Sequence, residues 1–299
     1  MTADFSWNLV ADIRDMWSLP FMVNAFRAGT IVAVLAALIG WFMVLRGQSF
    51  AGHTLALVGF PGAAAAVWLG IGLAYGYFAF CLAAALVIAV LPNRGGRGYV
   101  EESAVIGTVQ SFALASGMLF IALYKGFLNG TNALLFGSFL GITGGQVTEL
   151  AGVAAAALAV LAVIGRPLLF ASVDPDVAAA HGVPTRILGG GFLLLLGATA
   201  AEVSQITGAL LVFALLVLPP ATAQLITPRP ARSLALSVLL ALATLWLALF
   251  IAYYSSYPIG FWLTTVTFGL YALTHALRRA AAGLARHSAR ADRLAPARA

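Results

Sequence analysis

The sequence predicts an all-α membrane protein, a polytopic bundle of about nine (eight to ten) transmembrane helices. The first observation is composition, because 62% of the 299 residues are hydrophobic and only 9% are charged, far from the usual balance of a soluble domain. The second is a series of nearly uncharged runs that approach the roughly 20 residues a helix needs to cross a bilayer. Helices are expected in these runs because a helix satisfies its own backbone hydrogen bonds in lipid.

Nine hydrophobic segments follow one another along the chain, at residues 22–45, 54–72, 73–91, 103–124, 146–165, 187–203, 206–226, 234–254 and 258–277. The boundary between the second and third is the least defined, because Gly70, Gly72 and Gly76 leave little room for a turn. Small residues at 62–66 predict a close approach between the second segment and another helix. Residues 1–277 are therefore predicted to form a single transmembrane domain.

Basic residues predict how the chain is oriented. With the N-terminus outside and the C-terminus in the cytoplasm, thirteen of the 16 Lys and Arg residues are cytoplasmic, and Arg14, Arg27 and Lys125 are outside. The positive-inside rule describes this asymmetry, so the net charge of +6 reflects topology and not a nucleic-acid partner. Residues 278–299 are predicted to be a flexible, basic cytoplasmic tail, and an interfacial helix near anionic membrane lipid is the alternative.

Enzyme signatures are absent from the sequence. There is no G-x-x-x-x-G-K-[ST] loop to hold ATP phosphates, and the single lysine, Lys125, is predicted to lie outside. No G-x-S-x-G, H-E-x-x-H or C-x-x-C pattern occurs either. The only cysteine, Cys81, lies within an apolar segment and is expected to be a buried hydrophobic residue. We therefore expect no catalytic residues, and any ATP hydrolysis is expected in another subunit.

A few polar side chains inside the predicted spans are candidates for a substrate pathway. A charge near the bilayer centre costs about 2.5–3.5 kcal/mol on insertion scales, so each needs a partner, an aqueous cavity or an interfacial position. His53, near the inner end of the second segment, is either a metal ligand or a hydrogen-bonded interior residue. Glu202 and Gln205 lie near an outer helix end and either line a funnel or are solvated, and Glu149 is expected to cap or flank the start of its helix.

The stretch 166–186 (RPLLFASVDPDVAAAHGVPTR) is predicted to be a cytoplasmic segment that contains a short helix. Asp174 is a good N-cap, Pro175 suits the first helical position, and Gly182 suits the C-terminal stop. A short helix between two spans is either a contact for a soluble partner or an ordinary loop helix.

Four stretches carry a resemblance to a known family. They are 101–107 (EESAVIG), 134–141 (LLFGSFLG), 174–186 (DPDVAAAHGVPTR) and 207–223 (TGALLVFALLVLPPATA). In this order, and within similarity spread from about residue 44 to residue 275, they resemble the permease subunits of zinc/manganese-type ABC importers. The third is similar to the segment that contacts the ATPase in that family, which here comprises Asp174, Pro175, Asp176, Ala180, His181 and Gly182.

The resemblance implies import of a divalent transition-metal ion across the bacterial inner membrane, with zinc first and manganese next. It implies a homodimer of permeases, a separate ATPase subunit that binds ATP, and an extracytoplasmic metal-binding protein. No permanently bound cofactor is expected, because the ion passes through. The family places an Asp and a His four residues apart on the second helix, on one helical face. Here His53 and Leu57 occupy these places, and leucine cannot coordinate a metal.

Three alternatives remain from the sequence. The first is a permease for a metal chelate such as a siderophore complex. The second is a membrane-embedded enzyme with His53 and Glu202 as acid and base, although the predicted topology puts them toward opposite faces. The third is an assembly factor that transports nothing.

Overall fold

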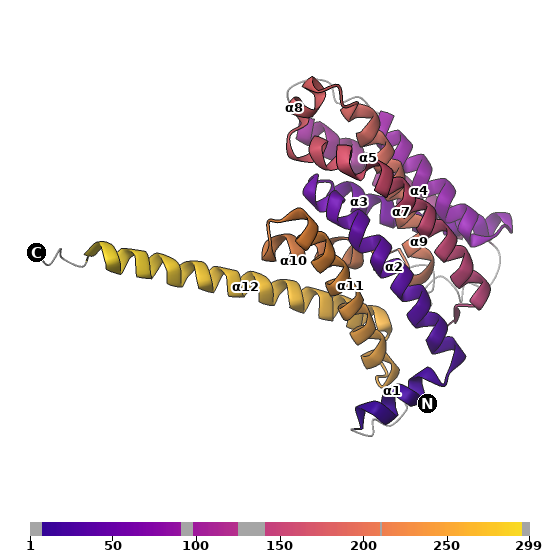
Figure 1. The fold of residues 1–299 in the computed structure, drawn as a ribbon. Helices are drawn as coiled ribbons and strands as arrows, with labels where there is room; N and C mark the ends of the chain where they lie inside the picture. The colour runs from indigo at the N-terminus through magenta and orange to yellow at the C-terminus, as the bar shows by residue number, and fades with distance from the viewer. Residues whose placement is uncertain (1–7, 91–97, 125–140, 210, 295–299) are drawn as a thin grey trace, which may run out of the picture.

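The computed structural model describes residues 8–90, 98–124, 141–209 and 211–294. Within these ranges the chain folds into eleven helices and contains no strand, in agreement with the predicted all-α class (Figure 1). The helices are α1 (Leu9–Trp17), α2 (Pro20–Leu45), α3 (Ser49–Leu69), α4 (Leu73–Val90), α5 (Gly98–Leu123), α7 (Gly144–Val173), α8 (Pro175–Ala180), α9 (Thr185–Thr207), α10 (Val212–Ile226), α11 (Pro230–Tyr253) and α12 (Ile259–Leu294). Residues 134–140 of the LLFGSFLG stretch lie outside the described residues.

Seven of the described helices are long and apolar enough to cross a membrane: α2, α3, α4, α5 from residue 103, α7, α9 and α11. Eight of the nine predicted segments each fall mainly on one helix, and segment 206–226 covers the end of α9 and all of α10. Helix α10 has only 15 residues, and α12 is not among the seven. The predicted count of nine spans is therefore not confirmed. Helix α12 continues to Leu294, past the expected domain boundary at residue 277.

The second and third predicted segments are two separate helices packed tightly together. Helix α3 ends at Gly70, whose φ of 69° lies in the left-handed region that glycine adopts without strain. A Cβ atom at Gly62 would meet the backbone carbonyl of Gly76, and one at Gly76 would meet that of Gly62. The two backbones are in contact here, which confirms the close approach predicted from the small residues at 62–66.

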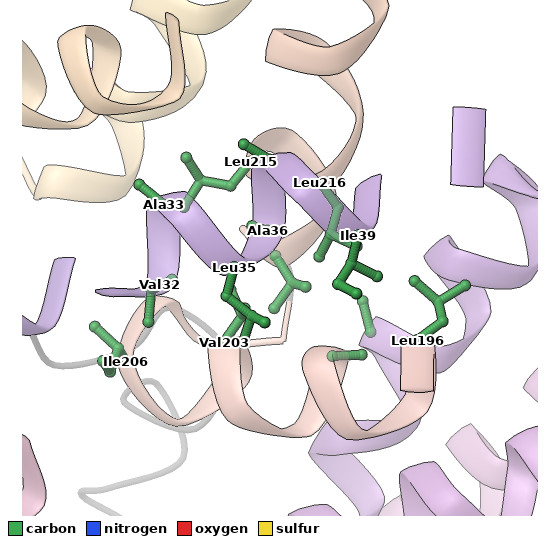
Figure 2. Close-up of a cluster of buried hydrophobic side chains, with 14 of the residues drawn as sticks. Val32, Ala33, Leu35, Ala36, Ile39, Leu196, Val203, Ile206, Leu215 and Leu216 are labelled. Carbon is green, nitrogen blue, oxygen red and sulfur yellow. The ribbon is translucent and has the colours of Figure 1, made fainter. Parts of the chain in front are cut away.

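The hydrophobic core is centred on α2, which packs against α9, α10, α11 and α7. Figure 2 shows the part of this core in which side chains of α2 meet those of α9 and α10, namely Val32, Ala33, Leu35, Ala36, Ile39, Leu196, Val203, Ile206, Leu215 and Leu216. All ten are buried, at 2% exposure or less. The backbones of α2 and α10 also meet at Gly40, because a Cβ there would contact the backbone of Leu216. The core thus holds α2, α9 and α10 in a fixed arrangement.

The two ends of the bundle are clearly separated. Helix α8 lies at one end, and α1 lies at the opposite end beside the turn between α11 and α12 (Figure 1). The Tyr254 hydroxyl, just after α11, donates a hydrogen bond of 3.0 Å to the backbone oxygen of Asp12 in α1. The assignment of these ends to the inside and the outside stays a prediction.

Candidate functional site

A pocket of about 1110 Å³ lies between α4, α7 and α9. It is located where α4 and α7 begin and α9 ends, so residues distant in sequence meet there. Most of the wall is apolar. Its polar lining comes from six side chains, Tyr75, Tyr77, Gln146, Glu149, Glu202 and Gln205.

The most buried acid of the pocket is Glu202 in α9, which is 1% exposed. Gln205, three residues later on the same helix, donates from Nε2 to Glu202 Oε2 at 3.4 Å, which is a long hydrogen bond. The other oxygen, Oε1, is buried and has no hydrogen-bond partner among the described residues. The carboxylate is therefore poorly compensated by the protein around it.

Glu149 lines the same pocket from α7 and is exposed. It does not cap α7, as one reading of the sequence expected. The cap is a capping box in which the Thr143 hydroxyl accepts from the Gln146 N–H at 3.3 Å, and Gln146 Oε1 accepts from the Thr143 N–H at 2.9 Å. The T-x-x-Q pattern at 143–146 is the sequence signal for this cap. Glu149 lies one turn further on, close enough for its charge to act on Glu202.

His53 does not line this pocket. It lies near the start of α3, half-buried, with its ring centroid 4.8 Å from that of Phe213 in α10. Its Nδ1 atom is buried and has no hydrogen-bond partner in the described part of the chain. Leu57, one turn later, is 9% exposed and offers no ligand.

Three of the four predicted pathway residues thus come together, and the fourth lies apart. The acid and base pair of the enzyme alternative, His53 and Glu202, is not assembled in the pocket. Over the ranges that the structure describes, no three His, Cys, Asp or Glu residues are grouped closely enough to hold a metal ion.

The short helix α8 has the caps that the sequence predicts. The Asp174 carboxylate accepts a hydrogen bond from the Val177 N–H at 3.0 Å, Pro175 is the first helical residue, and Gly182 follows the helix with φ of +79°. Ala178 is fully buried against the bundle, whereas the six residues of the predicted ATPase-contact segment are exposed. The capped helix is confirmed, and its contact with an ATPase stays a prediction.

Comparison with known proteins identifies the family. The ABC 3 transport family matches residues 18–278. The chain belongs to the ABC 3 transport family. This confirms the resemblance to the permeases of metal-type ABC importers, and it makes the chain a multi-pass membrane transporter component and not an enzyme.

Relatives of this ABC 3 permease cover most of its length. It is 29% identical over 240 residues to the manganese import system permease protein ScaB of Streptococcus parasanguinis, covering 80% of this chain and 84% of that protein. It is 30% identical over 234 residues to the chelated iron transport system membrane protein YfeC of Yersinia pestis, covering 78% of each. It superposes on PsaBC of Streptococcus pneumoniae, solved in complex with Fab, with a TM-score of 0.78, 26% identity and coverage of 89% of this chain and 95% of that chain.

A contact that the sequence did not predict joins the end of α7, just before α8, to the residue that follows α2 in this ABC 3 permease. Arg46, which follows α2, donates from Nη1 to the Ser172 hydroxyl at 3.2 Å, at the end of α7 and two residues before Asp174. Its guanidinium also lies 5.6 Å from the ring centroid of Phe192 in α9. Ser172 and Phe192 are far from Arg46 in the sequence, so the sequence alone does not predict these contacts.

Proposed function

We propose that the chain is the permease subunit of an importer that moves a divalent transition-metal ion into the cytoplasm, and that this ion is manganese in preference to zinc. The observation that carries the proposal is the family match over residues 18–278. It is supported by the relatives named for manganese import, which cover about four fifths of the chain. On this proposal the ion enters at the pocket of Glu149, Glu202 and Gln205 and passes toward His53, the tentative metal ligand.

The energy comes from partner subunits. We propose that an ATPase, which binds ATP, docks on α8, that two permease copies form the path, and that an extracytoplasmic metal-binding protein delivers the ion. The exposed face of α8 supports this docking surface. The coupling is a free energy supplied by ATP binding and hydrolysis in the partner, because this chain has no ATP-binding loop.

Helix α7 supports a direct mechanical link between the two ends. It is continuous over 30 residues, with Pro167 inside it, and at 1.5 Å per residue the path along the helix is about 45 Å. Glu149 lies near its start, and Ser172, held by Arg46, lies at its end beside α8. Movement of α8 by an ATPase would therefore move the helix that carries one wall of the pocket.

The test is uptake of radiolabelled manganese and zinc in a strain that lacks this chain, complemented by the wild type or by His53→Ala. We expect the wild type to restore manganese uptake and His53→Ala to restore less of it. Uptake of both ions that is unchanged by loss of the chain would contradict the importer function. Uptake restored equally by His53→Ala would remove His53 from the path.

A metal chelate is the second candidate cargo. Leu57 replaces the second ligand of the family pair, and the chelated iron transport protein YfeC is 30% identical to the chain. The pocket of about 1110 Å³ is also large enough for a small organic ligand, slightly above the roughly 300–1,000 Å³ of such sites. Uptake of iron only when a chelator is supplied would favour this cargo over the free ion.

A further inference from the structure

The side chain of Glu202 presents an electrostatic problem that the described protein does not solve. Its carboxylate is 1% exposed, yet one oxygen has only the 3.4 Å contact from Gln205 and the other has no hydrogen-bond partner among the described residues. A buried charge is costly unless it is paired or binds a cation. Glu149 across the pocket adds a second negative charge and increases this cost.

The pocket offers what a cation needs. Glu202 lines it directly, and Glu149 reaches it from another helix. Since Gln205 donates from its Nε2, its amide oxygen remains able to accept or coordinate. The volume of about 1110 Å³ leaves space for an ion together with water ligands.

The chemistry of the lining restricts which cation fits. Among the described residues that line the pocket there is no His, Cys or Met, and every polar side chain there carries an oxygen. Carboxylate, amide and water oxygens suit Mn²⁺, Mg²⁺ and Ca²⁺, whereas imidazole and thiolate favour Zn²⁺ and copper.

We propose that this pocket is an all-oxygen binding site for a hard divalent cation, held by Glu202 and Glu149, with the amide oxygen of Gln205 and water completing the shell. The site rests on the proposed function in that its occupant, Mn²⁺, is the cargo at the first step of import. The same site gives zinc no nitrogen or sulfur ligand, so preference for Mn²⁺ begins before the ion reaches His53.

The test is direct binding of Mn²⁺ to the purified full-length permease in lipid nanodiscs, followed by electron paramagnetic resonance. We expect one saturable Mn²⁺ per chain and affinity reduced by more than about tenfold in Glu202→Gln and in Glu149→Gln. Asp15→Asn is the matched control, because Asp15 is an exposed carboxylate in α1 away from the pocket lining. Glu149 is exposed, so Glu149→Gln leaves the packing intact. It therefore still tests the site if Glu202→Gln folds poorly.

Pulsed resonance of the bound Mn²⁺ reports its ligands. We expect no nitrogen coupling from imidazole. Three results would each overturn the proposal: no saturable binding in the wild type, binding by both Gln variants that equals that of the wild type, or nitrogen coupling from a histidine.

Binding and uptake separate the two proposals. Manganese uptake by a protein with no saturable Mn²⁺ in the pocket would contradict the binding site and support the importer function. Carboxylate-dependent Mn²⁺ binding in a chain that supports no uptake would support the binding site and contradict the importer function.

Discussion

The backbone contact between α3 and α4 allows a stability prediction for Gly62→Ala. A new Cβ would meet the carbonyl of Gly76 and lie 2.9 Å from Phe80 Cβ. A backbone carbonyl cannot rotate away, so α4 must shift, and overpacking of this kind costs about 1–3 kcal/mol. Alanine also improves helix propensity by about 1 kcal/mol over glycine, so the clash has to be measured against a glycine without one.

Gly152→Ala provides that control. Gly152 lies inside α7, and a Cβ there would meet nothing within 4 Å. Both variants gain the same helix propensity, so the difference between their unfolding free energies reports only the cost of the clash, about 1–3 kcal/mol. We expect Gly62→Ala to melt lower than Gly152→Ala in detergent, by about 2–4 °C for each kcal/mol. Equal melting temperatures would show that α3 and α4 are not in backbone contact at Gly62.

Three further predictions follow from single side chains. Asp174→Ala removes the cap of α8 and should destabilise that helix by about 0.5–2 kcal/mol, which should lower transport-coupled ATP hydrolysis in the assembled importer. Asp174→Ser keeps a capping side chain and should retain that hydrolysis. Equal loss of hydrolysis in both variants would contradict a capping role. Cys81 is fully buried, so maleimide should label it only after unfolding, and rapid labelling of the folded chain would contradict its place in the core. In a Cys81→Ala background, Tyr257→Cys should react with an impermeant maleimide from outside intact cells and His181→Cys should not. The reverse pattern would show that the chain has the opposite orientation to the predicted one.

Local patterns were the reliable part of the sequence prediction. The caps of α8 were predictable because Asp174, Pro175 and Gly182 act on a backbone only a few residues away. The pairing of Glu202 with Gln205 was also local, since residues three apart share one helical face. The cap of α7 was not predicted, although Thr143 and Gln146 carry the T-x-x-Q pattern of a capping box.

The number of spans was harder to predict because hydrophobicity does not measure helix length. Residues 206–226 form one apolar run in the sequence, but the structure divides it between the end of α9 and α10, with Gly208 at the C-cap of α9. An apolar segment packed inside the bundle and one that crosses lipid have similar compositions. The count therefore depends on how the segments are folded against one another.

The sequence by itself determined that this protein is an all-α membrane protein with a capped helix on a connecting segment, because composition, periodicity and capping act locally and are written in consecutive residues. Only the tertiary structure decided that Glu149 joins Glu202 and Gln205 around one pocket while His53 lies elsewhere. These residues come from α7, α9 and α3, and their separations depend on how the helices pack. That packing is set by buried contacts such as those of α2 with α9 and α10, which no single segment of the sequence contains.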